Sequence, residues 1–143
     1  NVMDQLKKTD QAFIVYGMNK AGKDKNIVYK KFDEDEFLDD FAKCRYVITN
    51  GGFNVISEAL FLRKPMIVLP IEKQYEQILN AECVQKQGYG VHFKRIDKDI
   101  LEKFQERLEE YRSNMSKFKW DFEKIYNIIN KVIRDEKKLK KEK

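Results

Sequence analysis

With 143 residues, of which 42% are hydrophobic and 13% aromatic, the chain has enough apolar material for one folded domain, and intrinsic disorder is excluded. It contains no long uncharged apolar segment and no charged-then-apolar secretory leader, so we expect a cytoplasmic protein without a membrane span. Cys44 and Cys83 are lone cysteines in apolar surroundings and outside any metal-ligand spacing, which predicts buried, reduced thiols.

The formal net charge of +5 is concentrated near the C-terminal end, where residues 137–143 read KKLKKEK. Such a run is typical of a solvated tail, because like charges resist packing. It also fits a peripheral attraction to anionic lipid. Nucleic acid is not expected as a partner, since no binding motif and no interleaving of aromatic and basic residues accompany the lysines.

Strand and helix patterns alternate from the start of the chain. Residues 1–8 have the pattern of the end of a helix that is already under way. Residues 12–16 are predicted to form a buried strand, residues 18–25 a polar loop and residues 26–30 a second strand. Asp33 followed by Glu36 forms a capping box, so a helix is expected to begin there. Its spacing predicts an inward face made of Phe37, Leu38, Phe41 and Ala42.

The middle of the chain contains two apolar runs, 45–49 and 66–69, with the length of buried strands. Between them lie the turn Asn50-Gly51-Gly52 and a helix that ends before Pro65. Residues 74–87 are expected to be helical, with Ile78, Leu79 and Val84 facing the sheet and Gly88 ending the helix. A last short strand covers 90–93, and its His92, the single histidine, matches no motif and is expected to be structural or exposed.

Two helices are predicted after Asp97, over 97–112 and 114–135. The second has an apolar stripe that is expected to pack in the core or at a domain interface: Met115, Phe118, Phe122, Ile125, Ile129 and Val132. The expected fold class is α/β, a Rossmann-like, mostly parallel sheet flanked by helices. We divide the chain into a sheet-containing part, 1–96, the helices that complete it, 97–136, and the lysine-rich tail, 137–143.

The glycine turn is the strongest candidate for a ligand site. In parallel α/β sheets, ligands bind beyond the carboxyl ends of the strands, and this turn follows Thr49 at such an end. Two adjacent glycines let the backbone approach a ligand, and the amides of the helix that follows carry partial positive charge. The stretch therefore predicts an anion site suited to a phosphate. The alternative is a turn without a ligand.

Several separate motifs share the order and spacing of a known family. They are the glycine turn with Phe53 and Asn54, Glu58-Ala59-Leu60, Lys64-Pro65, Pro70, Glu76-Gln77, Asn80-Ala81 and Gly88-Tyr89-Gly90. Together they resemble the donor-binding, C-terminal domain of GT-B glycosyltransferases, in the branch that includes the lipid-linked N-acetylglucosaminyl transferase of peptidoglycan synthesis and the UDP-glucuronosyl and plant UDP-glycosyl transferases. The resemblance spans residues 27–91.

The resemblance implies roles for particular residues. Asn50, Gly51, Gly52 and Asn54 would contact the diphosphate, although the plant and glucuronosyl enzymes usually have histidine where Asn50 lies. Glu58 would accept hydrogen bonds from the ribose 2'- and 3'-hydroxyls, and Glu76 with Gln77 would hold the sugar hydroxyls. Phe32 and Asp33 lie where relatives hold the base. The alternatives are a solvent-facing Glu58, an ordinary polar helix start at Glu76, and a core position for Phe32.

The resemblance also shows what this stretch of sequence lacks. In similar enzymes the general base comes from the N-terminal domain, so no catalytic residue is assigned here, and no metal or other cofactor is expected. The first strand of the C-terminal domain also has no counterpart. We therefore expect an incomplete donor-binding half that uses a UDP-sugar and needs an acceptor domain or partner chain. The alternatives are a nucleotide-sugar epimerase or hydrolase of similar fold, and a non-catalytic donor-binding subunit.

Overall fold

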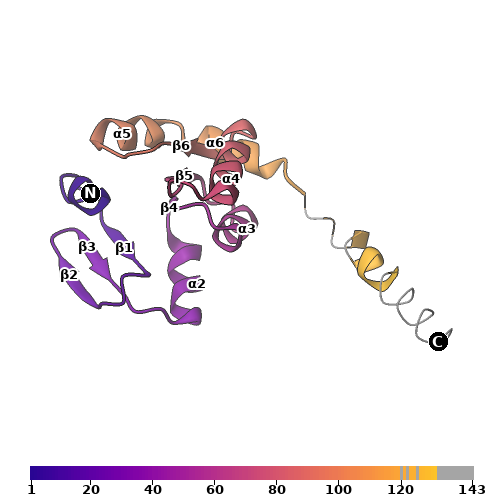
Figure 1. The fold of residues 1–143 in the computed structure, drawn as a ribbon, viewed down its shortest axis with the longest axis horizontal. Helices are drawn as coiled ribbons and strands as arrows, with labels where there is room; N and C mark the ends of the chain where they lie inside the picture. Colours follow the sequence, from indigo (N-terminus) through magenta and orange to yellow (C-terminus); the bar gives the residue numbers. More distant parts are fainter. Residues whose placement is uncertain (120, 122, 125, 132–143) are drawn as a thin grey trace.

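The computed structural model describes residues 1–119, 121, 123–124 and 126–131. Helices and strands alternate along the chain in the order α1 (Val2–Leu6), β1 (Phe13–Val15), β2 (Gly22–Asp24), β3 (Ile27–Tyr29), α2 (Glu34–Lys43), β4 (Val47–Thr49), α3 (Phe53–Phe61), β5 (Met66–Val68), α4 (Tyr75–Lys86), β6 (Gly90–His92), α5 (Lys98–Glu106) and α6 (Leu108–Ser116) (Figure 1). The predicted α/β class is confirmed.

The strands form two three-stranded sheets rather than one. In the first sheet the order is β1-β3-β2, with β1 parallel and β2 antiparallel to β3. In the second the order is β4-β5-β6, and both pairs are parallel. β1 and β4 are therefore edge strands of separate sheets among the described residues.

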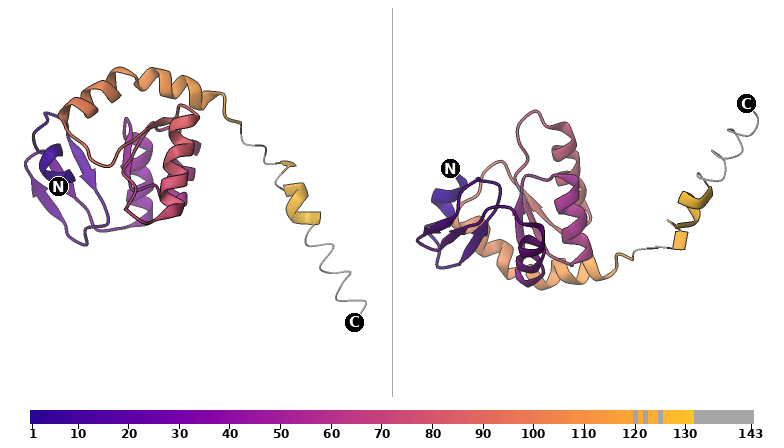
Figure 2. Two further views of the ribbon diagram at one scale, coloured as in Figure 1. Left: turned by 45° about the horizontal axis from the view of Figure 1, so that its top comes forward. Right: turned by 90° about the horizontal axis from the view of Figure 1, so that it is seen from below.

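Helices join the two sheets into one layered body, and α5 and α6 run along both (Figure 2). One buried cluster contains residues of both sheets and of these helices, including Ile27 from β3, Ile67 from β5 and Phe104 from α5. A second cluster lies on the other face of β5, where Met66 and Val68 pack with residues of α2, α3, α4 and α6. Because β5 is covered on both faces, its three residues are completely buried.

The N-terminal part of the structure corrects three expectations. β2 lies in the segment predicted to be a loop, because its exposed residues carry no apolar pattern. It pairs with β3 through a two-residue turn in which Lys25 has φ of 55°. Ile14 of the predicted buried strand is exposed, since β1 is an edge strand. Asn1 caps α1 by accepting hydrogen bonds from the Met3 and Asp4 N–H groups, so residue 1 is at a helix start rather than near an end.

Helix faces and helix breaks also differ from the prediction. Leu38 and Ala42 of α2 and Leu79 of α4 are exposed, and so is Cys83, whereas Cys44 is half-buried. The break between the last helices falls at Arg107 instead of at 113–114, and α6 continues through Asn114, whose Nδ2 donates to the Gly88 carbonyl at 3.1 Å.

The predicted apolar stripe of the last helix is only partly described. Met115 is buried and Phe118 half-buried, as expected, whereas Ile129 is exposed. Phe122, Ile125 and Val132 lie outside the described residues, as does the lysine-rich segment 137–143.

Candidate functional site

The glycine turn lies at the carboxyl end of β4 and has the geometry of a close-packed loop. Gly51 has φ of 92°, in the region that favours glycine, and a Cβ there would lie 2.8 Å from Val68 Cγ1 and 3.2 Å from the Gln77 carbonyl oxygen. Gly51 N–H donates to Thr49 Oγ1 at 3.2 Å, and Gly52 N–H to Asn50 Oδ1 at 3.3 Å. In this structure Asn50 therefore shapes the turn through its side chain.

The start of α3 leaves backbone donors available beside this turn. Gly52 is the N-cap and supplies no side-chain acceptor, and Ile56 N–H makes the first intrahelical bond, to the Gly52 carbonyl at 3.2 Å. The amides of Phe53, Asn54 and Val55 precede that bond, so they are donors that the helix itself does not use. An anion can bind such amides, which point along the positive end of the helix dipole. The sequence predicted amides at this helix start, and the structure identifies them as those of Phe53, Asn54 and Val55.

Residues of α4 hold the turn in place. Asn80 Nδ2 donates to the Gly51 carbonyl at 3.1 Å. Gln77 Oε1 accepts from the Ile71 N–H at 3.0 Å, which ties the loop after β5 to α4. The side-chain oxygen of Gln77 is therefore occupied by the loop, and its side-chain NH₂ group remains as a donor for a ligand. Glu76, in the first turn of α4, is exposed.

Glu58 lies on α3, one helical turn beyond Asn54, and is half-buried. Burial raises the pKa of this carboxyl, and the nearby Glu34 carboxylate raises it further. Glu34 is the first residue of α2, so Glu58 faces the start of that helix. Sequence reasoning did not find Glu34, and no motif in the sequence marks it.

The two candidate base-binding residues have different environments. Phe32 is 68% exposed, which excludes the core position, and its ring centroid lies 5.5 Å from that of Phe37. The Asp33 carboxylate caps α2 by accepting the Glu36 N–H at 3.0 Å. The reciprocal half of the predicted capping box is replaced by an ion pair, because the Glu36 carboxylate contacts Lys30 Nζ at 2.7 Å.

A polar network braces α2 against the first sheet. Lys30 Nζ donates to Asp40 Oδ2 at 2.7 Å, and the Tyr16 hydroxyl donates to the same oxygen at 2.6 Å. Burial, and then the bond to Asp40, raises the pKa of Tyr16 to about 12. Lys30 follows β3 and Tyr16 follows β1, so the network lies at the carboxyl edge of the first sheet, next to Phe32.

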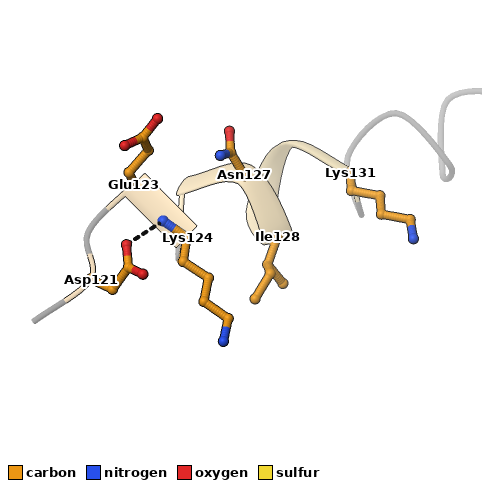
Figure 3. Close-up of a pocket in the computed structure, with 6 residues that line it drawn as sticks. All are labelled: Asp121, Glu123, Lys124, Asn127, Ile128 and Lys131. Atoms are coloured by element: carbon orange, nitrogen blue, oxygen red, sulfur yellow. Dashed lines mark hydrogen bonds between the residues drawn. The ribbon is translucent and has the colours of Figure 1, made fainter.

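A hollow elsewhere in the molecule does not belong to this site. Figure 3 shows its lining residues, Asp121, Glu123, Lys124, Asn127, Ile128 and Lys131, all within one segment. Among the described residues, no group of three or more His, Cys, Asp or Glu side chains is placed to hold a metal ion. None of the helices in the described part of the chain is both long and apolar enough to cross a bilayer.

Comparison with known proteins identifies the family. A family model described as glycosyl transferase family 1 matches residues 1–109. The chain belongs to this glycosyltransferase family. This chain spans about a third of the length of the relatives described below.

Two curated relatives illustrate the match. The UDP-N-acetylglucosamine–N-acetylmuramyl-(pentapeptide) pyrophosphoryl-undecaprenol N-acetylglucosamine transferase of Clostridium botulinum strain Kyoto is 35% identical over 123 residues, covering 76% of this chain and 35% of the relative. The second transferase of that name from Bacillus cereus is 31% identical over 115 residues, covering 73% of this chain and 32% of the relative.

Solved glycosyltransferases share the fold of this family member. The glycotransferase of kitacinnamycin superposes with a TM-score of 0.66 at 21% identity, over 80% of this chain and 33% of the other. SnogD from Streptomyces nogalater superposes with a TM-score of 0.64 at 15% identity, over 90% of this chain and 38% of the other. The chain has the fold of a GT-B C-terminal domain.

Proposed function

We propose that this chain is the donor-binding half of a glycosyltransferase that moves a sugar from a UDP-sugar to a lipid-linked acceptor. The observation that carries the proposal is the close-packed turn at Gly51, followed by a helix start with unused amides, in a member of a glycosyltransferase family. The names of the relatives in Clostridium botulinum and Bacillus cereus make UDP-N-acetylglucosamine the first donor to test.

In this proposal the backbone supplies the main catalytic contribution of the chain. The N–H groups at the start of α3 bind the diphosphate and stabilise the charge that develops as it leaves the anomeric carbon. These dipoles are already oriented, because Gly51 is packed against Val68 and held by Asn80. The group that takes the proton from the acceptor hydroxyl is expected from polypeptide outside residues 1–143.

The side chains around the turn would orient the rest of the donor. Glu58 accepts hydrogen bonds from the ribose hydroxyls, and Phe32 offers an exposed ring for stacking on the base. Glu76 and the amide group of Gln77 hold the hydroxyls of the sugar at the start of α4. Asp33 would meet the base through its backbone, since its carboxylate is bound to the Glu36 N–H.

A calorimetric titration with UDP tests this assignment, with UMP, GDP and dTDP as competing ligands. Glu58→Ala is expected to weaken UDP binding by about 10- to 100-fold, as for the loss of a charged hydrogen-bond acceptor. Glu82→Ala removes an exposed carboxylate from α4 and serves as the matched control with unchanged affinity. Equal binding of UDP by both variants, or equal binding of all four nucleotides, contradicts the proposed site.

Product analysis separates the transferase from other reactions of a nucleotide-sugar. The test uses UDP-N-acetylglucosamine and a polypeptide that also contains the proposed acceptor-binding half. Without an acceptor, a hydrolase releases free sugar and an epimerase returns an isomeric donor, whereas the proposed enzyme does neither. A non-catalytic subunit binds UDP here and gives activity only with a separate catalytic chain.

We also propose that the protein acts in the cytoplasm beside the inner face of the membrane. The seven-residue lysine-rich segment 137–143 would supply the attraction to anionic lipid. Co-sedimentation with phosphatidylglycerol vesicles should be lost at high salt, in neutral vesicles and on removal of this segment. Binding that survives all three changes overturns this part of the proposal.

A further inference from the structure

The loop between β3 and α2 contains both candidate base-binding residues, Phe32 and Asp33. Lys30 begins this loop, and its N–H donates to the Val15 carbonyl of β1 at 3.0 Å. Asp33 ends the loop and is the N-cap of α2, where its carboxylate accepts the Glu36 N–H. The loop is therefore tied at one end to the first sheet and at the other end to the helix.

A capping box consists of two hydrogen bonds, and at the start of α2 only one of them is made. In the complete motif, the acidic side chain at the third helical position accepts a hydrogen bond from the N–H of the N-cap residue. Glu36 occupies that position, but its carboxylate binds Lys30 Nζ at 2.7 Å. Among the described residues, none accepts a hydrogen bond from the Asp33 N–H. This donor is therefore available to a ligand, directly after the exposed ring of Phe32.

The cation that binds Glu36 is itself fixed in place. Lys30 Nζ also donates to Asp40 Oδ2 at 2.7 Å, and Asp40 lies one helical turn after Glu36 on α2. The Tyr16 hydroxyl donates to the same Asp40 oxygen at 2.6 Å. The side chains of Lys30 and Asp40 are 24% and 18% exposed, whereas that of Glu36 is 51% exposed. The anchored ammonium group therefore sets where the more exposed carboxylate lies.

We infer that Lys30 is a positioning residue for nucleotide binding, because it holds the Glu36 carboxylate away from the Asp33 N–H and keeps that donor available to a carbonyl oxygen of the base. The identity of the ligand, a uridine nucleotide, rests on the proposed function. Without Lys30, the Glu36 carboxylate completes the capping box and occupies the donor. It then also places a negative charge where the acceptor oxygen of the base would lie.

Direct attraction between Lys30 and the diphosphate does not explain the arrangement. The ammonium group contacts two carboxylates, those of Glu36 and Asp40, so the three groups together carry a net negative charge. Such a group does not attract a diphosphate. The effect of Lys30 on nucleotide binding is therefore expected to act through Glu36.

Two substitutions of Glu36 test this role and leave the bond between Lys30 and Asp40 in place. Glu36→Gln removes the charge that binds Lys30 but can still accept the Asp33 N–H, since glutamine also completes capping boxes. It should weaken UDP binding by about threefold or more, whereas Glu36→Ala, which has no acceptor, should stay within about 1.5-fold of the unchanged chain. Asp35→Asn removes the same charge from the same helical turn and is the matched control, with unchanged UDP affinity.

The reverse experiment removes the cation. Lys30→Met should weaken UDP binding by about fivefold and leave the affinity for pyrophosphate unchanged, and the addition of Glu36→Ala should restore UDP binding. Lys30→Arg retains a cation that can bind two carboxylates and should bind UDP as the unchanged chain does. Lys31→Met, which removes an exposed lysine of the same loop, is the control.

Calorimetric titration measures all of these affinities. Equal UDP affinities of Glu36→Gln and Glu36→Ala overturn the inference, and this pair decides even where Lys30→Met does not fold. A double variant that binds UDP no better than Lys30→Met also overturns it, as does an equal loss of UDP and pyrophosphate binding in Lys30→Met.

A measurement without nucleotide separates this inference from the proposed function. The Asp33 amide proton resonance should move downfield in Glu36→Gln relative to Glu36→Ala, because the amide gains a hydrogen bond. Equal resonance positions overturn the inference even where the unchanged chain binds UDP. If the unchanged chain binds no UDP, the proposed function fails, and the amide resonance still shows whether Lys30 controls the position of Glu36.

Discussion

The two sheets of this domain are stabilised in different ways. The second sheet, β4-β5-β6, is stabilised by apolar burial. Met66, Ile67 and Val68 are completely buried, and Gly90 lies so close to the Met66 backbone of β5 that there is no room for a Cβ. The first sheet, β1-β3-β2, also buries Ile27 and Tyr29 of β3, but all residues of β2 are exposed and polar links join the sheet to α2. In the proposed donor site, the diphosphate would therefore lie beside the apolar sheet and the nucleoside beside the sheet with polar links.

The largest effect is expected from crowding the second sheet. A Cβ at Gly90 would lie 1.9 Å from the Met66 carbonyl oxygen, so Gly90→Ala must separate β5 from β6 and should lower the unfolding free energy by about 3 kcal/mol or more. Gly52→Ala is the control, because its nearest atom lies at 3.8 Å, and it should cost no more than about 1 kcal/mol, the effect of replacing an N-cap glycine by alanine. Denaturant titration measures both. Equal unfolding midpoints for the two variants would show that β5 and β6 accommodate the added methyl group without loss of stability.

The next largest effect is expected at the glycine turn. Gly51→Ala combines backbone strain with contacts to Val68 and Gln77, and should cost about 2 kcal/mol of stability and at least tenfold in UDP affinity. Gly17→Ala isolates the strain, since Gly17 has φ of 84° but no atom within 4 Å of the added carbon. It should cost about 1 kcal/mol and leave UDP binding unchanged. If both variants lose affinity equally, the turn is not the phosphate site.

A smaller, pH-dependent effect is expected in the first sheet. Lys30 and then Tyr16, which both donate to Asp40, hold the pKa of this carboxyl below its usual value. The stabilisation is therefore present above about pH 4, the unfolded pKa, and is lost as the pH falls through the lower folded pKa. Asp40→Asn should cost about 1 kcal/mol at pH 7 and flatten the loss of stability below pH 4.

Asp39→Asn is the matched control for Asp40. Its carboxylate is 60% exposed and pairs only with Lys43 on the same helix, so stability and its pH dependence should change little. Thermal unfolding followed from pH 2 to pH 7 compares the two variants. Identical acid profiles would mean that the network around Asp40 does not stabilise the first sheet.

The smallest effect is expected at the exposed cysteine of α4. Cys83 is exposed, whereas Cys44 is half-buried, and burial raises the pKa of its thiol. Iodoacetamide should therefore modify Cys83 in the native protein and reach Cys44 only slowly or after unfolding. Cys83→Ser should change the unfolding free energy by less than about 0.5 kcal/mol. Mass spectrometry of the peptides that contain Cys83 and Cys44 measures the extent of labelling at each thiol. Faster labelling of Cys44 than of Cys83 would contradict the described burial.

Sequence reasoning was most accurate where the local pattern is strong. The apolar runs ending at Thr49 and beginning at Met66 are strands, and the helix start at Asp97 is capped as predicted. It was wrong where burial depends on distant neighbours, as at Leu79 and Cys83. A helical apolar pattern predicts a face but does not say whether another element covers it.

By itself, the sequence determined the α/β class, the family and the place of the candidate site, because glycines, caps and apolar runs act through a few neighbouring residues. Only the tertiary structure decided that the side-chain oxygens of Asn50 and Gln77 accept hydrogen bonds from backbone N–H groups. It also decided that Glu34 lies near Glu58 and that the strands form two sheets. The approach of Glu34 to Glu58 and the arrangement of the sheets join residues far apart in the chain, so they depend on how whole helices and sheets pack. The bonds made by Asn50 and Gln77 span two and six residues, and they depend on the exact backbone geometry of each loop.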